Sequence, residues 1–520
     1  MASKIKVDTL ETANGSGSIT INNPINTAGI TSVTLGTSNF VAGVNAGNSI
    51  TSGGNYNTTI GDEAGTAITT GDNNVAVGYN SLTANTTGTD SVAIGHSALL
   101  AQTTGGDNVA IGHLAMSSLT TAGNNTAVGD RAMQANTSGE NNVAIGTLAL
   151  DANTTGASNT AVGRDSLTAN TTGTQNTAVG KSALAANTTA GQNTAMGREA
   201  LFANTTGADN TAIGAAALYS NTTASSNTAV GRSCLINNTT GAENVAVGAE
   251  SLDANTTGVQ NNAIGYLSLT SCTTGSYNVA MGVAALNDTT TGESNVALGH
   301  LSSYSNLTGS SNTAVGQKSF YTNTTGTSNV VVGKSAMYYN TTGAGNTAVG
   351  VNALTANTTA SNNTAVGTDA LKANTTGSLN VAVGRHALLA CTTGSDNTGI
   401  GTYALDSTTT GNSNIAIGHG AISTSSTASG QCTLGNSAIS NLRCNDTSIS
   451  SLSDSRDKTD VVDSPFGLDF INTVRPVQFL WDTRDGNVKD GTTRIGFLAQ
   501  ELLAATNGNN AVLDLVLDDN

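Results

Sequence analysis

A short pattern of polar and apolar residues recurs along most of the chain. A glycine stands every 17 residues, 23 times without a slip, from Gly61 to Gly435. Counted from this anchor glycine as position 0, position −1 is apolar in every repeat and position −2 is Ala in 19 of 23. Position −3 is mostly Thr or Val, and position −4 is Asn in 21 of 23. The alternation over positions −3 to −1 predicts a short β-strand before each anchor glycine.

A second apolar element and a turn complete each repeat. The element usually ends in Leu at position +4, as in Leu82 and Leu99. The sequence N-T-T-G follows, as in Asn153–Gly156, and its residue types are typical of a turn. The glycine of this turn is replaced by Ala in five copies, so a positive φ is not required there. We therefore expect two short strands and two turns in each repeat.

A unit of this kind is one coil of a parallel β-solenoid. Coils stack at the strand spacing of about 4.8 Å, so 23 of them predict a rod on the order of 110 Å long. The anchor glycines, such as Gly78, Gly95 and Gly112, keep equivalent residues in register. The asparagines at −4, among them Asn74 and Asn108, suggest a ladder of side-chain amides along the stack. They also suit a turn, and both roles are compatible.

The outer faces of such coils are expected to be flat. Together with the constant small Ala, this favours several solenoids packing side by side. The repeat resembles the NSVAIG-type repeats of trimeric adhesin heads, although those have a shorter period. The predicted fold class is therefore all-β, a 17-residue-repeat solenoid rod with a small α+β domain at the C-terminus.

Composition and charge exclude several other classes of protein. Only 3% of the residues are aromatic and 37% apolar, which is too few for several ordinary globular cores. The formal charge of −16 excludes a nucleic-acid coat. No apolar run is long enough for a membrane helix, and the N-terminus lacks the apolar segment of a signal peptide. We expect synthesis in a cytosol and no membrane insertion.

The sequence offers little metal or cofactor chemistry. Its five cysteines lie far apart and show no zinc spacing, and Cys272 and Cys391 occupy positions where most repeats place Asn. Histidines at position +1 have no carboxylate or cysteine at a fixed spacing. The acidic residues before each Asn recur too irregularly for calcium loops. We expect no metal and no cofactor.

Variable positions of the repeat are the candidate binding surface. Position +5 carries Tyr304, Tyr321 and Tyr338 on three successive coils, and Phe202 and Tyr219 on two others. Aligned tyrosines suit a groove between chains, where each aromatic pair contributes about 0.5–1.5 kcal/mol. They also suit a platform on which a receptor sugar stacks. We favour the groove, and keep the platform as the receptor-binding hypothesis.

The two ends differ from the repeats. Residues 57–439 form the predicted shaft, 440–452 a linker and 453–520 a separate domain. Residues 1–56 lack the period. Within them, Ile5–Asn23 resembles N-terminal segments of cyanophage tail fibres, and this resemblance implies attachment to the virion, to phage tail or other virion proteins.

The C-terminal residues have the composition of a globular domain. They contain S-D-S-R-D-K at Ser453–Lys458, then G-L-D-F-I-N-T-V-R-P-V-Q-F-L-W at Gly467–Trp481, then G-F-L-A-Q-E from Gly496. We expect a helix near Phe466–Thr473, strands near Pro476–Asp482 and Thr493–Phe497, and a second helix to about Ala505. In order and spacing these blocks resemble the endosialidase-type intramolecular chaperone domain of phage tail fibres and tailspikes.

The resemblance implies a domain that forms a homotrimer and guides the assembly of the fibre. Such domains then often release themselves by cleavage. The family's cleavage site corresponds to Ser453, next to Asp454, and its base to Lys458. A serine hydroxyl needs a neutral amine nearby to take its proton, and burial lowers a lysine pKa. The alternative is that these residues form a solvated turn. The sequence stops soon after the G-F-L-A-Q-E block, so we expect an incomplete chaperone, in which cleavage is an open question.

These features favour a trimeric phage tail fibre that adsorbs to a glycan or protein of the bacterial surface. A bacterial trimeric adhesin is an alternative, but it needs an export signal and an anchor. An ice-binding solenoid would need threonines two apart on one strand. A polysaccharide depolymerase would need regularly repeated carboxylate pairs. Beyond self-cleavage, we expect no enzymatic activity on an external substrate.

Overall fold

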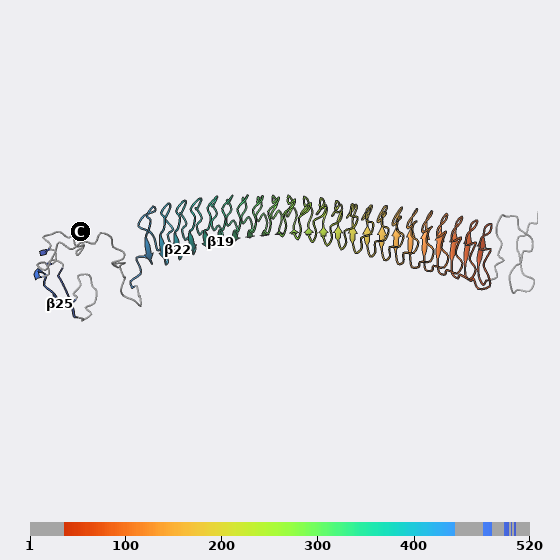
Figure 1. Cartoon of the computed structure of the whole chain (residues 1–520), viewed down its shortest axis with the longest axis horizontal. Helices are drawn as coiled ribbons and strands as arrows, with labels where there is room; N and C mark the ends of the chain where they lie inside the picture. The colour runs from red at the N-terminus through yellow and green to blue at the C-terminus, as the bar shows by residue number, and fades with distance from the viewer. Residues whose placement is uncertain (1–35, 442–471, 481–492, 499–500, 502–503, 506–520) are drawn as a thin grey trace, which may run out of the picture. The chain divides into compact units, whose positions relative to one another are not determined.

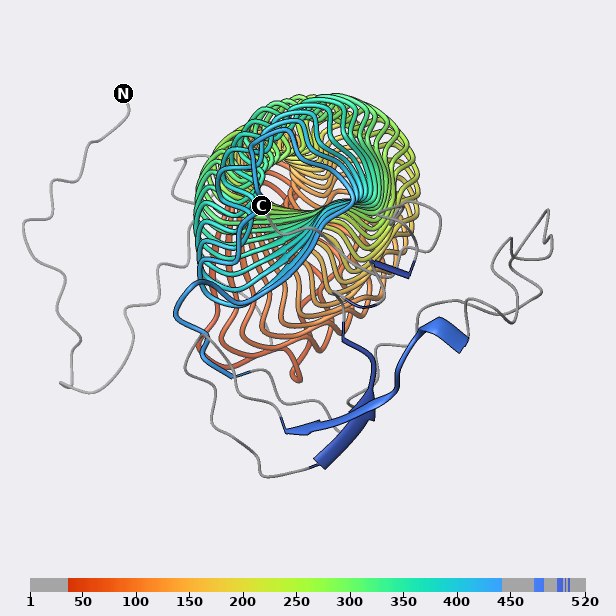
Figure 2. The same ribbon diagram turned by 90° about the vertical axis from the view of Figure 1, so that its left-hand side faces the viewer.

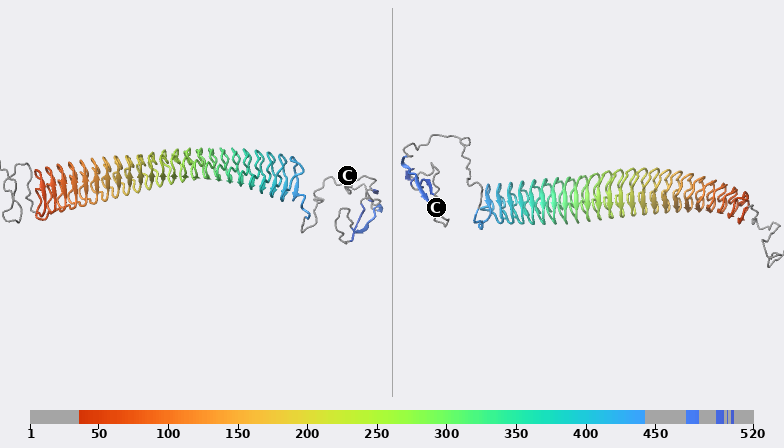
Figure 3. Two further views of the ribbon diagram at one scale, coloured as in Figure 1. Left: turned by 180° about the vertical axis from the view of Figure 1, so that it is seen from behind. Right: turned by 90° about the horizontal axis from the view of Figure 1, so that it is seen from below.

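The chain coils upon itself as a parallel β-solenoid, which confirms the predicted fold class. The computed structural model describes residues 36–441, 472–480, 493–498, 501 and 504–505. The chain divides into two units, Met1–Ser440 and Asn441–Asn520. The described part of the first unit is a gently bowed rod (Figure 1 and Figure 3). Seen end-on, its coils superpose as a ring whose orientation changes gradually along the rod (Figure 2).

Each coil contributes one three-residue strand to a 24-stranded sheet, and each strand pairs in parallel with the strand of the next coil. The strands are β1 Phe40–Ala42, β2 Thr58–Ile60, β3 Val75–Val77, β4 Val92–Ile94, β5 Val109–Ile111, β6 Thr126–Val128, β7 Val143–Ile145, β8 Thr160–Val162, β9 Thr177–Val179, β10 Thr194–Met196, β11 Thr211–Ile213, β12 Thr228–Val230, β13 Val245–Val247, β14 Asn262–Ile264, β15 Val279–Met281, β16 Val296–Leu298, β17 Thr313–Val315, β18 Val330–Val332, β19 Thr347–Val349, β20 Thr364–Val366, β21 Val381–Val383, β22 Thr398–Ile400, β23 Ile415–Ile417 and β24 Cys432–Leu434.

The sheet begins one coil earlier than the predicted shaft boundary at residue 57. Strand β1 pairs with β2, and Phe40 lies opposite Thr58. Gly43 of this first coil has a φ of 142°, like the anchor glycines, but it stands 18 residues before Gly61 rather than 17. The extra residue conceals this coil from a search for a strict 17-residue period.

The predicted second strand of each coil is wrong, because the segment after the anchor glycine turns sharply. Its residues at +2 and +4 adopt positive φ, for example 59° at Asp165 and 50° at Leu167. Such values are unfavourable for residues other than glycine. The backbone nevertheless bonds along the stack: Asp165 N–H donates to Thr147 O and Leu167 N–H donates to Ala183 O, both at 3.0 Å. Inter-coil hydrogen bonds therefore continue through a segment that is not extended.

The interior of the rod is narrow. The Ala at position −2 of each strand is fully buried in its own chain, as are Ala161 and Ala178, and the Leu at +4 packs beside it. The side chain at −2 thus faces inward, and the narrow space inside the coil explains why this residue is small. Our expectation that this Ala points to packing between solenoids was wrong. The outward strand positions are −3 and −1.

Two ladders of asparagine side chains run through the interior. In the first, at position −4, Asn74 donates its side-chain N–H to Asn57 Oδ1 at 3.1 Å and to Gly88 O at 2.9 Å. Asn108 Oδ1 likewise accepts the backbone N–H of Asn125 at 3.0 Å. These side chains are buried, so the bonds satisfy polar groups that water cannot reach.

The second ladder, at position +7, was read from the sequence only as a turn. It consists of the asparagines of the N-T-T-G segment: Asn170 Nδ2 donates to Asn153 Oδ1, and Asn187 Nδ2 to Asn170 Oδ1, both at 2.9 Å. Leu119 interrupts it, and two adjacent coils do so at Cys272 and Thr289 and again at Cys391 and Thr408. Asn255 Oδ1 and Asn374 Oδ1, one coil before each cysteine, are buried without a hydrogen-bond partner.

These interruptions predict that Cys272→Asn and Cys391→Asn stabilise the rod locally. A new amide would donate to the orphaned oxygen, which is worth about 1 kcal/mol, or about fivefold in local opening. Hydrogen exchange of peptides covering residues 252–275 and 371–394 should slow by that factor. Cys272→Ala, which restores no donor, is the control. If exchange in the Asn variants is as fast as in the wild type, or faster, the new amides do not stabilise the ladder.

The second unit contains a two-stranded antiparallel sheet, β25 Val477–Leu480 and β26 Thr493–Gly496. Both strands lie within the ranges predicted for them. Residues 472–473, 501 and 504–505 are helical, within the two predicted helical segments. In the part of the chain that the structure describes, no helix is long and apolar enough to cross a membrane.

Candidate functional site

The tyrosines at position +5 form a stack on the outside of the rod. Each follows the buried residue at +4, whose positive φ turns the next side chain outward. The ring centroids of Tyr304 and Tyr321 lie 5.3 Å apart, and those of Tyr321 and Tyr338 lie 4.9 Å apart, with interplanar angles of 14°. Their spacing is that of the coils, because the backbone is bonded coil to coil: Thr322 N–H donates to Tyr338 O at 3.0 Å.

Side chains from neighbouring positions extend the tyrosine stack. Tyr339, which is 55% exposed, meets Tyr338 edge-on with a centroid distance of 4.7 Å. Lys318 Nζ lies 5.9 Å from the centroid of Tyr321, within cation–π range. We call Tyr304, Tyr321, Tyr338, Tyr339 and Lys318 the tyrosine cluster.

A carboxylate lies at the N-terminal end of the tyrosine cluster. Burial raises the pKa of Asp288, and a hydrogen bond with Ser305 opposes that shift. The negative charge of Asp288 is in turn the main reason why the pKa of Tyr304 is raised, followed by burial and by Tyr321. The cluster therefore combines aromatic rings, phenolic hydroxyls, an ammonium group and a carboxylate on one surface. Sequence reasoning missed Asp288 and Ser305, because they stand at position +6, which is most often Ala and did not suggest polar chemistry.

A second aromatic pair occupies the same +5 column. The rings of Phe202 and Tyr219 are stacked with a centroid distance of 5.0 Å and an interplanar angle of 8°. No charged side chain is recorded against this pair among the described residues. The pair therefore repeats the packing of the tyrosine cluster without its charged groups.

Histidines at +1 also stack along the rod. The rings of Tyr79, His96 and His113 follow one another at 5.4 and 5.3 Å, and His113 Nδ1 lies 2.8 Å from Asp130 Oδ1. In residues 36–441 and the described C-terminal segments, no group of three or more His, Cys, Asp or Glu could hold a metal ion.

The buried cysteines Cys272 and Cys391 remain protonated. Burial raises the pKa of Cys272 to about 12 and that of Cys391 to about 11, so both are thiols at neutral pH. Each sulfur lies 3.5 Å from a turn carbonyl, Gly275 O or Gly394 O, in the place of the missing asparagine. They act as small replacements in the ladder, as the sequence suggested.

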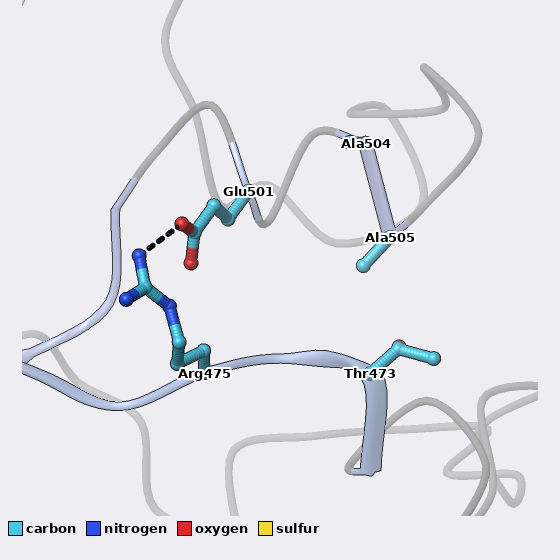
Figure 4. A pocket seen from close by; sticks show the side chains of 5 residues that line it. All are labelled: Thr473, Arg475, Glu501, Ala504 and Ala505. Atoms are coloured by element: carbon cyan, nitrogen blue, oxygen red, sulfur yellow. Dashed lines mark hydrogen bonds and ion pairs between the residues drawn. The ribbon is translucent and has the colours of Figure 1, made fainter.

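The C-terminal unit brings two of its sequence blocks together. Arg475, of the R-P-V block, forms a 2.7 Å ion pair with Glu501, of the A-Q-E block (Figure 4). Both lie around an open hollow with Thr473, Ala504 and Ala505. The predicted cleavage residues Ser453, Asp454 and Lys458 lie outside the described residues.

Comparison with known proteins agrees with the C-terminal resemblance. Residues 453–513 match the family described as chaperone of endosialidase. The match covers the three sequence blocks and leaves the solenoid outside it. No curated protein and no solved structure matches the chain. The C-terminal unit is thus similar to an intramolecular chaperone, joined to a solenoid rod that the comparisons leave without a relative.

The stacked rings predict a measurable contribution of Tyr321 to stability. Its ring lies between two others, so Tyr321→Ala removes two aromatic contacts and should cost about 1–3 kcal/mol in local unfolding free energy. Tyr321→Phe keeps both contacts and should be close to neutral. Urea unfolding followed by tyrosine fluorescence tests the difference. Equal midpoints for the two variants would show that the stack does not stabilise the rod.

Proposed function

We propose that this chain is a trimeric virion fibre, a phage tail fibre, that adsorbs to the bacterial surface. This proposal rests on one observation: a single chain combines a chaperone-like C-terminal segment with a long solenoid rod. A solenoid sheet pairs residues across many coils, and such pairings form slowly and slip easily. A domain that associates first would set the register of three chains.

The exposed residues of the C-terminal sheet support association of this domain. Leu480 is 57% exposed and Ile495 80% exposed, on the same face of β25 and β26. A two-stranded sheet is marginally stable alone, and an uncovered apolar face adds to that deficit. Contact with equivalent residues of two further chains would cover it.

The tyrosine cluster is the proposed receptor contact. Its rings, hydroxyls, ammonium and carboxylate are the groups that bind the apolar faces and hydroxyls of a sugar, with Tyr339 the most exposed aromatic ring among them. Three chains per fibre would present three such clusters, and several fibres per particle would raise the overall affinity further. Within residues 1–56, the part that precedes the first coil, including Ile5–Asn23, is the proposed attachment to the virion.

Ser453 and Lys458 are the proposed self-cleavage pair. The Lys458 amine, when neutral, would take the proton of the Ser453 hydroxyl as that oxygen attacks the adjacent peptide carbonyl. The C–N bond of that peptide would then break, with the proton passing from Lys458 to the leaving amine, and water would hydrolyse the resulting ester and restore the serine hydroxyl. This role comes from similarity to the chaperone family. Cleavage would free the fibre from its chaperone, whereas an uncut chain would keep the domain as a permanent cap.

Light scattering after size exclusion should give the mass of three chains, and denatured intact mass should show whether cleavage occurs. A fragment ending near Ser453 in the wild type, absent from Ser453→Ala and Lys458→Ala, would establish self-cleavage by these two residues. An intact wild-type chain would exclude it. A folded monomer would overturn the trimeric fibre.

Receptor binding can be tested on an array of bacterial lipopolysaccharides and capsular polysaccharides with the labelled fibre. Tyr339→Ala should reduce binding to the recognised polysaccharide at least tenfold, because it removes the most exposed ring of the cluster. Tyr277→Ala is the matched control, since Tyr277 is equally exposed at 55% and lies on other coils. Equal losses in both variants, or none in either, would contradict the assignment of the cluster.

A further inference from the structure

One continuous apolar stripe runs along the outside of the rod. It consists of the outward residues of β1–β24, at positions −3 and −1. Every residue at −1 from Ile60 to Leu434 is apolar, and none of them is buried. Those with the largest exposure, 36% to 50%, are Ile60, Ile94, Ile111, Ile145, Met196, Ile213, Ile264, Met281, Val383, Ile400, Ile417 and Leu434. Position −3 adds mostly Thr and Val, and neither column contains a charged residue.

The stripe is longer than the apolar patches of a solitary soluble protein. The largest such patch on a monomer is about 300–600 Å², whereas here twelve side chains at −1, each 36% to 50% exposed, are spread over 23 successive coils. The stripe is also as long as the rod and repeats with the coil spacing. A second surface with the same length and repeat is that of another copy of this chain.

The two edges of the stripe carry opposite charge. Because all strands run in the same direction, position +1 always lies at one edge, and positions −5 and −6 lie at the other. At +1, Lys and Arg outnumber Asp and Glu by six to two, and they stand at Arg164, Lys181, Arg198, Arg232, Lys334 and Arg385. Positions −5 and −6 carry no Lys or Arg, but have Asp72, Asp90, Asp107, Glu140, Asp209, Glu243, Glu293 and Asp396.

Opposite edges meet when identical chains pack in parallel around an axis along the rod. An antiparallel pair would instead bring like edges together. We propose that the stripe is the interface between copies of this chain, packed in parallel with the basic edge of each against the acidic edge of the next. This inference rests on the trimer proposed above, and adds to it the face, the direction and the pairing of the chains.

Three arginines identify specific contacts. Arg198, Arg232 and Arg385 stand at +1, and the following coil carries Asp209, Glu243 and Asp396 at −5. All six residues are exposed, so these charges are available to a neighbouring chain. In one chain the two members of each pair lie on opposite edges of the stripe. Between chains, each arginine would face the acid of its neighbour.

Acidic residues of the same chain reduce the positive charge of the +1 edge but do not reverse its sign. Arg198 lies 3.6 Å from Glu199, and Arg232 forms an ion pair with Glu250. These pairs leave the arginine side chains 64% and 63% exposed. The acidic exceptions at +1 are Asp62 and Asp130, and Asp130 is already paired with His113.

Disulfide trapping tests the pairing. In a Cys432→Ser, Cys444→Ser background, Arg198→Cys with Asp209→Cys should give covalent dimers and trimers on mild oxidation. Arg198→Cys with Thr206→Cys, whose second residue lies exposed in the N-T-T-G turn, should remain uncrosslinked. Crosslinking of the control pair to the same extent would overturn the proposed arrangement.

Carboxylates introduced into the apolar stripe should separate the chains. Val179→Asp, Met196→Asp and Ile213→Asp together place three carboxylates in the interface, and the mass by light scattering should fall toward one chain. Thr189→Asp, Thr206→Asp and Thr223→Asp, in exposed turns of nearby coils, should leave the mass unchanged. Circular dichroism verifies that each variant keeps its coils.

The outcomes separate this inference from the proposed function. A wild-type monomer would overturn both. A wild-type trimer that keeps its mass in the stripe variant and gives no crosslink between residues 198 and 209 would overturn the interface alone. Trimers that crosslink at 198 and 209, and dissociate when the stripe is charged, are the expected result.

Discussion

Each anchor glycine lies close to the anchor glycine of the next coil, and the rest of the rod depends on this contact. At Gly163 the φ is 135°, and a Cβ would lie 2.5 Å from the carbonyl oxygen of Gly180 in the next coil. No other residue fits such a contact at normal cost. Because this contact recurs from coil to coil, it holds successive coils in register, in the 18-residue first coil as in the 17-residue coils that follow. Equivalent groups then stack, which is why amides meet amides in the interior and rings meet rings outside.

Much of this arrangement follows from the sequence, because a strict period converts each sequence position into a row in space. The strands, their parallel pairing and the Asn74 ladder follow from glycine spacing and from a polar residue at a constant place. The stacking of Tyr304 on Tyr321 follows in the same way, since 17 residues separate them. In the C-terminal unit, alternating residues around Phe479 sufficed to predict a strand.

Other features depend on details that a period does not reveal. Leu167 looks like part of a strand by composition, yet its backbone turns, because burial of its side chain and inter-coil hydrogen bonds outweigh its preference for negative φ. The N-T-T-G asparagines match a turn so well that their ladder was not apparent. The alternation shows that the Ala side chain at −2 points away from the side chains at −3 and −1. It does not show which of the two sides faces the interior of the coil. At the tyrosine cluster, Asp288 is an exception at a position that is most often Ala, so only the fold reveals its proximity to Tyr304.

The absence of any insertion between Gly61 and Gly435 has a consequence for how such a rod changes during evolution. A duplication or deletion of seventeen codons adds or removes one whole coil, and the new ends meet in the same register as the old ones. Length is therefore adjustable in steps of about 4.8 Å without redesign of any contact. The first coil shows how one extra residue is accommodated: 18 residues separate Gly43 from Gly61, yet Asn39 Oδ1 still accepts the backbone N–H of Asn57 at 2.8 Å. Recombination between repeats offers a route by which the reach of the molecule changes while its cross-section stays the same.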